Sequence, residues 1–163
     1  MSFQQRTTGL LAALALVLPA STHAQTSSSE LLSSLSFRHI GVVGNRIASV
    51  AGVAGNPLVY YAGAASGGLW KTEDGGVRWR PLFDELDVHS VGALAVSLSD
   101  PQIVWAGTGE PHIRSNVTVG DGVYKSMDGG DNWQHMGLDA TGRISRLVIH
   151  PTNPDIVYAA SLG

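Results

Sequence analysis

The segment GEPHIRSNVTVGDG, from 109 to 122, carries five side chains that could bind or transform a ligand. They are Glu110, His112, Arg114, Asn116 and Asp121. Most glycosidases use two carboxylates across the scissile bond. Glu110 and Asp121 could in principle fill this role. Guanidinium groups bind carboxylates in bidentate fashion. Arg46 and Arg143 could therefore help to hold an anionic or hydroxyl-rich ligand beside this segment.

Repeated sequence surrounds these candidates and predicts the elements that position them. KTEDGGVRW (71–79) returns as KSMDGGDNW (125–133), and NPLVYYAG (56–63) returns as DPQIVWAG (100–107) and NPDIVYAA (153–160). The prolines of the second motif, Pro57, Pro101 and Pro154, are 44 and 53 residues apart. Arg46 and Arg143 occupy equivalent places in this repeat, which favours a scaffold role, pairing with carboxylates or carbonyls, over ligand binding.

Each repeat unit is expected to form four short antiparallel strands. In the second unit they are predicted at Ser90–Leu98, Ile103–Thr108, Gly122–Met127 and Asn132–Met136, where apolar runs alternate with turn residues. Glycine and proline leave no window with helical periodicity. We therefore predict an all-β chain of β-propeller blades, at about 46–83 and 90–136, with half of a third at 143–163. Trp70 and Trp105 are expected in the core.

The Asp-Gly-Gly stretches are interpreted as hairpin turns rather than reactive sites. An aspartate can accept hydrogen bonds from the turn's backbone, and glycine supplies the positive φ that such turns need. The following tryptophan can fold back over the hairpin. A calcium site at Asp128 and Asp131 is a less favoured alternative, because a full set of oxygen ligands is not visible. The histidines lack metal-ligand spacing, so no metal is expected, and no cofactor is expected either.

Both turns resemble the Asp-box, or bacterial neuraminidase repeat, Ser/Thr-x-Asp-x-Gly-x-x-Trp. The matching residues are Thr72, Asp74, Gly76 and Trp79 in one copy, and Ser126, Asp128, Gly130 and Trp133 in the other. Nearly the whole chain after residue 36 is similar to the N-terminal part of exported, sortilin-type bacterial propellers that are often labelled glycosyl hydrolases. The resemblance implies either binding of peptides and proteins, as in sortilins, or glycoside hydrolysis, as in sialidases and xyloglucanases. Xyloglucanases carry a catalytic aspartate where this chain has Ala65, which disfavours their chemistry.

Antiparallel strand order predicts that any ligand site lies opposite the Asp-Gly-Gly turns. Loops after the second and fourth strands share one face, and turns after the first and third share the other. The distance from the motif proline to the turn aspartate grows from 17 residues in the first unit to 27 in the second. The extra residues fall within 109–122, and an inserted loop is more often functional than structural.

The N-terminus predicts export. Residues 1–24 combine Arg6, an apolar run and a small-residue end, as a signal peptide does, and 25–36 form a Ser-rich linker. Arg6 is the only charged residue of the first segment, so 9 basic and 13 acidic residues remain, a net charge of −4. This balance does not suit nucleic-acid binding. The chain has no cysteine, and no second apolar run predicts membrane insertion after signal removal.

We therefore expect a periplasmic or extracellular protein. The prediction is a non-catalytic propeller module that recognises protein, peptide or glycan, with the remaining blades supplied by a longer chain or by other copies. The alternative is the N-terminal part of a glycoside hydrolase whose catalytic carboxylates lie beyond residue 163.

Overall fold

The structure, a computed structural model, describes residues 41–42 and 46–162. The predicted signal peptide (1–24) and linker (25–36) lie outside the described residues. The described part contains ten strands and no helix. Within that part, accordingly, no helix has the length and apolar character needed to cross a membrane.

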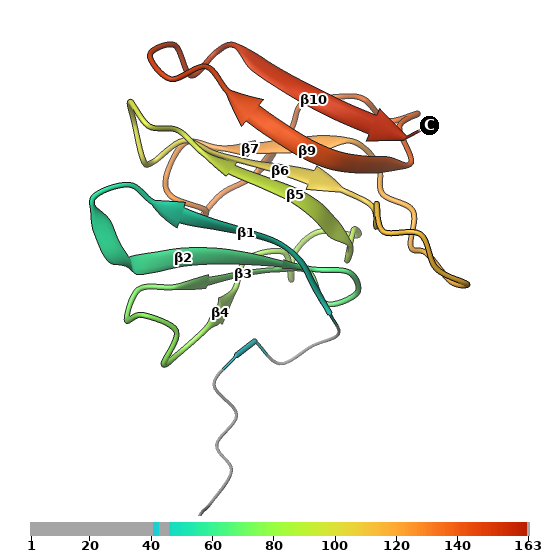
Figure 1. The fold of residues 1–163 in the computed structure, drawn as a ribbon, viewed down its shortest axis with the longest axis horizontal. Coiled ribbons are helices and arrows are strands. Elements are labelled where there is room, and N and C mark those ends of the chain that lie inside the picture. The colour runs from blue at the N-terminus through green and yellow to red at the C-terminus, as the bar shows by residue number, and fades with distance from the viewer. Residues whose placement is uncertain (1–40, 43–45, 163) are drawn as a thin grey trace, which may run out of the picture. The chain divides into compact units, whose positions relative to one another are not determined.

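The strands form three antiparallel sheets in which consecutive strands pair in chain order (Figure 1). Blade 1 contains β1 (Ile47–Val53), β2 (Asn56–Ala64), β3 (Leu69–Thr72) and β4 (Arg80–Pro81). Blade 2 contains β5 (Val91–Val96), β6 (Val104–Thr108), β7 (Val123–Ser126) and β8 (Gln134–His135). Half-blade 3 contains β9 (Arg143–Ile149) and β10 (Val157–Leu162). The expected fold class, four-stranded antiparallel blades with half of a third, is confirmed.

The sheets pack face to face through two hydrophobic clusters. The cluster that joins blades 1 and 2 includes Tyr61, Leu69, Phe83, Val91, Val104 and Tyr124. The cluster that joins blade 2 to half-blade 3 contains Ala93, Trp105, Val123, Ile144 and Leu147. Because β6 contributes to both clusters, all five of its residues are buried. This explains why its sequence is a continuous apolar run rather than an alternating one.

Two glycines let adjacent blades approach more closely than side chains would allow. A Cβ on Gly63 of β2 would lie 2.7 Å from Cγ1 of Val91 in β5. A Cβ on Gly107 of β6 would lie 2.4 Å from Cγ2 of Ile144 in β9. Carbon atoms in ordinary contact are about 3.5–4.0 Å apart. The same glycine-to-aliphatic contact therefore joins each pair of successive blades.

The two tryptophans expected in the core differ in the structure. Trp105 is 9% exposed and belongs to the cluster between blade 2 and half-blade 3. Trp70 is only half-buried, so the core prediction is wrong for this residue. It alternates along β3 with the fully buried Leu69 and so lies on the other face of the strand. Its Nε1 donates a hydrogen bond of 2.6 Å to the carbonyl of Gly67.

Candidate functional site

The two Asp-Gly-Gly turns join the third and fourth strands of blades 1 and 2. In blade 2, Asp128 Oδ1 accepts hydrogen bonds from the backbone N–H groups of Asp131 and Asn132, at 3.0 and 2.9 Å, and from Ser126 Oγ at 2.8 Å. Ser126 Oγ in turn accepts the N–H of Gly130 at 2.8 Å. The aspartate and the serine thus satisfy the donors of a turn whose glycines have positive φ.

The blade 1 turn repeats this arrangement atom by atom. Asp74 Oδ1 accepts the N–H groups of Val77 and Arg78 and the hydroxyl of Thr72. The N–H of Arg78 is the main cause that lowers the pKa of Asp74. In blade 2 the hydrogen bond from the N–H of Asn132 is the main cause that lowers the pKa of Asp128, to about 2.

Each turn is closed by its tryptophan. Trp79 Nε1 donates to the carbonyl of Gly76 at 3.1 Å, and Trp133 Nε1 donates to Gly130 at 3.0 Å. Trp133 also packs edge-on against Phe83 of blade 1, with ring centroids 5.2 Å apart. These residues therefore stabilise the hairpin and the contact between blades.

Asp131, the second carboxylate of the calcium alternative, accepts a hydrogen bond from Arg80 at 2.7 Å. Nowhere in 41–42 or 46–162 do three or more His, Cys, Asp or Glu side chains gather as metal ligands would.

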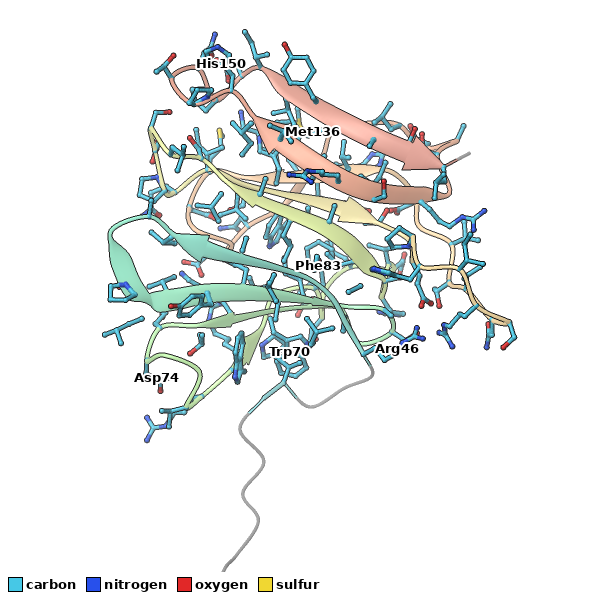
Figure 2. All side chains as sticks on the ribbon, in the orientation of Figure 1. Arg46, Trp70, Asp74, Phe83, Met136 and His150 are labelled. Atoms are coloured by element: carbon cyan, nitrogen blue, oxygen red, sulfur yellow. The ribbon has the colours of Figure 1, made fainter. Side chains whose placement is uncertain are left out.

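The inserted loop lies at the other end of the blades from these turns. Figure 2 shows Asp74 and Arg46 at opposite ends of blade 1. Glu110, in the inserted loop, forms an ion pair with Arg46. The loop closes on itself through the N–H of Glu110, which donates to the carbonyl of Thr118 at 2.8 Å. The candidate ligand residues of this loop are therefore on the rim opposite the aspartate turns.

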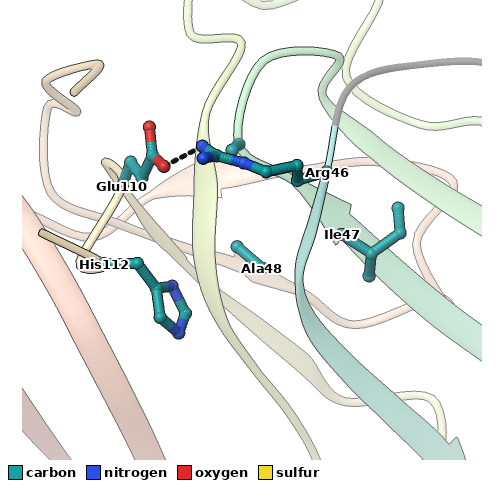
Figure 3. A pocket seen from close by; sticks show the side chains of 6 residues that line it. Arg46, Ile47, Ala48, Glu110 and His112 are labelled. Carbon is teal, nitrogen blue, oxygen red and sulfur yellow. Dashed lines mark hydrogen bonds and ion pairs between the residues drawn. The ribbon is translucent and has the colours of Figure 1, made fainter. Parts of the chain in front are cut away.

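Glu110 is the central charged group of this rim. Its side chain is 1% exposed. Arg114 contacts both carboxylate oxygens, with Nε 2.8 Å from Oε1 and Nη2 2.9 Å from Oε2. Arg46, whose side chain is 48% exposed, approaches Oε1 from the position just before β1 (Figure 3). We call these three residues the arginine–glutamate cluster. The hydrogen bond from Arg114 lowers the pKa of Glu110, and the charges of both arginines act in the same direction.

A small pocket opens beside the arginine–glutamate cluster. Its volume is about 290 Å³, and its walls are Arg46, Ile47, Ala48, Ala65, Glu110 and His112 (Figure 3). Two guanidinium groups face one carboxylate here, so the formal charge of the cluster is positive. Such a pocket suits a small anionic or hydroxyl-bearing group. Its volume is at the lower end of the range for ligand pockets, about 300–1,000 Å³.

The remaining sequence candidates are not brought into this pocket. Asp121 Oδ2 accepts the hydroxyl of Tyr124 at 2.7 Å, and its Oδ1 accepts that of Thr108 at 3.2 Å. Asn116 is exposed elsewhere on the inserted loop. Arg143 is half-buried at the start of β9 and does not line the pocket. The structure thus groups three of the seven predicted ligand residues in a charged cluster, with His112 beside it.

Sequence reasoning missed the residue that anchors the base of the inserted loop. Thr108, fully buried at the end of β6, accepts the N–H groups of Asp121 and Gly122 at 2.9 and 3.0 Å. Its single hydroxyl hydrogen is shared between the carbonyl of Gly122, at 2.7 Å, and Asp121 Oδ1, at 3.2 Å. A threonine ending an apolar strand before a long loop is the signal that could have indicated it.

Comparison with known proteins supports the fold. The sequence matches no protein-family profile and no curated protein. Among solved structures, an ancestral GH74 enzyme superposes with a TM-score of 0.60 at 22% identity, over 74% of this chain. A GH74 enzyme from Niastella koreensis gives 0.55 at 20% identity, over 69% of this chain. The fold is that of β-propeller blades. The chain spans only 17% and 16% of the lengths of these two structures.

Proposed function

We propose that this chain is a non-catalytic binding module of an exported protein, which recognises protein, peptide or glycan through the rim that carries residues 109–122. The proposal includes export by a signal peptide at residues 1–24 and the Asp-box, sortilin-type character of the blades. Mass spectrometry of the exported protein tests the first of these, because cleavage before Gln25 should set its N-terminus.

The main support for this proposal is that the carboxylate of Glu110 is already paired with Arg114 and Arg46. Both of its oxygens are hydrogen-bonded to Arg114, and its side chain is 1% exposed. A glycosidase general acid needs a raised pKa so that it holds a proton at neutral pH. Glu110 has a lowered pKa and lacks the exposure that a nucleophile or base would need to reach a sugar. Its geometry instead supports the role of holding two arginines in place.

The other candidate acid supports the same view. Both carboxylate oxygens of Asp121 are engaged by hydroxyl groups of Thr108 and Tyr124. Ala65 lines the pocket at the place where the resemblance to xyloglucanases puts an aspartate. The pocket beside Arg46 is therefore lined by cationic and apolar groups and by one carboxylate, that of Glu110, which is engaged by two arginines.

The tip of the inserted loop supplies the test of binding. Ile113 is 94% exposed there, and large exposed apolar side chains are common at recognition sites. Mature protein is applied to immobilised arrays of glycans and peptides, and Ile113→Ser is expected to weaken each positive signal about ten-fold. Val77→Ser is the matched control, because Val77 is an exposed apolar residue of the opposite turn. Equal loss in both variants, or no binding at all, contradicts the proposal.

A glycoside hydrolase is the second candidate, favoured by the structural likeness to GH74 enzymes. Incubation with soluble β-glucans and measurement of new reducing ends tests it. We expect no product. Turnover that is lost in Asp121→Ala or Glu110→Ala would replace the binding proposal by the enzymatic one.

A further inference from the structure

A second pocket lies on the rim of the aspartate turns, within the complete four-stranded sheet of blade 1. Its volume is about 280 Å³, and its walls are Lys71, Glu73, Asp74, Arg78, Trp79 and Arg80. These residues come from β3, β4 and the turn between them. Asp74 and Arg46 lie at opposite ends of blade 1 (Figure 2), so this pocket is separate from the one beside the arginine–glutamate cluster.

The turn of blade 2 forms an equivalent pocket that differs in charge. Its walls align one by one with those of the blade 1 pocket, and they are Lys125, Met127, Asp128, Asn132, Trp133 and Gln134. The lysine, the aspartate and the tryptophan are the same in both blades, as residues that build the hairpin should be. Blade 1, however, has Arg78 and Arg80 where blade 2 has an asparagine and a glutamine. A scaffold must repeat whereas a site need occur only once, so the two arginines are candidates for ligand binding.

The carboxylates around the blade 1 pocket are already engaged. Glu73 pairs with Lys71 at 2.9 Å, and the side chain of this lysine is only 10% exposed. Asp74 Oδ1 accepts the backbone N–H groups of its own turn. Asp131 of blade 2 pairs with Arg80 at 2.7 Å and so holds that guanidinium at the pocket wall. These contacts offset two of the three positive charges that line the pocket.

Arg78 supplies the third positive charge. The residue is exposed, and its guanidinium makes no hydrogen bond or ion pair within the part of the chain that the structure describes. Trp79 lines the same pocket and is half-buried, and its Nε1 donates to the carbonyl of Gly76 at 3.1 Å. The rest of the indole is apolar. The pocket thus combines a guanidinium, which can bind a carboxylate in bidentate fashion, with an aromatic wall.

We propose that the blade 1 pocket binds a sugar acid, a pyranose ring that carries one carboxylate. Arg78 pairs with the carboxylate, since one remaining positive charge matches a monoanion. The ring lies against the indole of Trp79. Glu73, whose side chain is 64% exposed, accepts hydrogen bonds from the sugar hydroxyl groups, which a simple fatty or aromatic acid lacks. This site does not depend on the proposed recognition by the rim at 109–122.

Titration of the ¹⁵N-labelled protein with glucuronate, followed by NMR at pH 7, tests the proposal. Glucuronate is expected to shift the indole resonance of Trp79 and the Nε–H resonance of Arg78, while the indole of Trp133, its counterpart in blade 2, stays unmoved. Glucose, which has the ring without the carboxylate, and benzoate, which has a carboxylate without hydroxyl groups, should each bind at least five-fold more weakly. Equal binding of either control, or an equal shift of Trp133, overturns the proposal.

Charge variants separate this contact from general attraction of anions. Arg78→Gln is expected to weaken glucuronate binding about ten-fold, as loss of a charge-assisted hydrogen bond does. Arg146→Gln is the matched control and should leave binding unchanged, because Arg146 is an exposed arginine of β9 outside the pocket. Equal weakening in both variants contradicts the proposal. If Arg78→Gln does not fold, the titration of the unaltered protein still decides, and a negative result there leaves the binding function of the opposite rim untouched.

Discussion

Replacement of Asp128 tests whether the aspartate turns stabilise the blades. Its carboxylate accepts two backbone N–H groups, the hydroxyl of Ser126 and the side-chain amide of Asn132. The N–H donors belong to exposed residues, so water replaces part of what is lost. By analogy with helix N-caps, Asp128→Ala should lower the free energy of unfolding by about 1.5 kcal/mol. For a protein of this size the thermal midpoint should fall by about 5 °C.

The pH dependence gives an independent magnitude for the same group. Lowering its pKa from 3.8 to about 2 corresponds to roughly 2.5 kcal/mol without screening. Partial exposure to solvent reduces this to about 1 kcal/mol. Because the pKa is depressed in the folded state, this stability is present above about pH 4 and is lost as the pH falls toward 2.

Urea unfolding at pH 7, 4 and 2.5 measures both effects. The wild-type protein should lose more stability between pH 4 and 2.5 than Asp128→Asn, whose side chain does not titrate in this range. Asp74→Ala, in the equivalent turn without the amide contact of Asn132, should be the milder of the two alanine variants. Parallel pH profiles for wild type and Asp128→Asn, or an unchanged midpoint in Asp128→Ala, would refute the stabilising role of the turn.

Three further perturbations address contacts between blades. Gly107→Ala should destabilise the protein by about 2 kcal/mol in urea unfolding, because its Cβ would overlap the fully buried side chain of Ile144. Tyr61→Phe should cost about 1 kcal/mol and remove the phenol that titrates with a pKa of about 12 in ultraviolet titration. Glu110→Gln should lower the thermal midpoint at pH 7. The difference from wild type should shrink below pH 4.5, because the unfolded chain then takes up a proton at this carboxyl whereas the lowered pKa keeps the native carboxylate ionised.

The fold could be predicted from the sequence because its signals are local. Asp128, Gly129 and Trp133 lie within one hairpin, and their spacing indicates the turn before any long-range contact is known. The strands of blade 2 are similarly evident from short apolar runs between turn residues. Repetition of the pattern then fixed the antiparallel order, which correctly separated the inserted loop from the aspartate turns.

The contacts between blades could not be predicted in the same way. Arg46 and Glu110 are 64 positions apart, and their pairing depends on how blade 1 is rotated against blade 2. Pairing of an arginine with a carboxylate was foreseen as a possibility, but its partner was not. The half-buried position of Trp70 was missed because a four-residue strand gives no indication of which face is covered.

The glycine contacts between blades determine more than local packing. Gly63 and Gly107 lie opposite Val91 and Ile144, on the strands that begin the following sheets. The absence of a Cβ at these two points sets how closely one sheet approaches the next. A methyl group at either would push the neighbouring sheet away, so the distance between successive blades depends on two missing side chains.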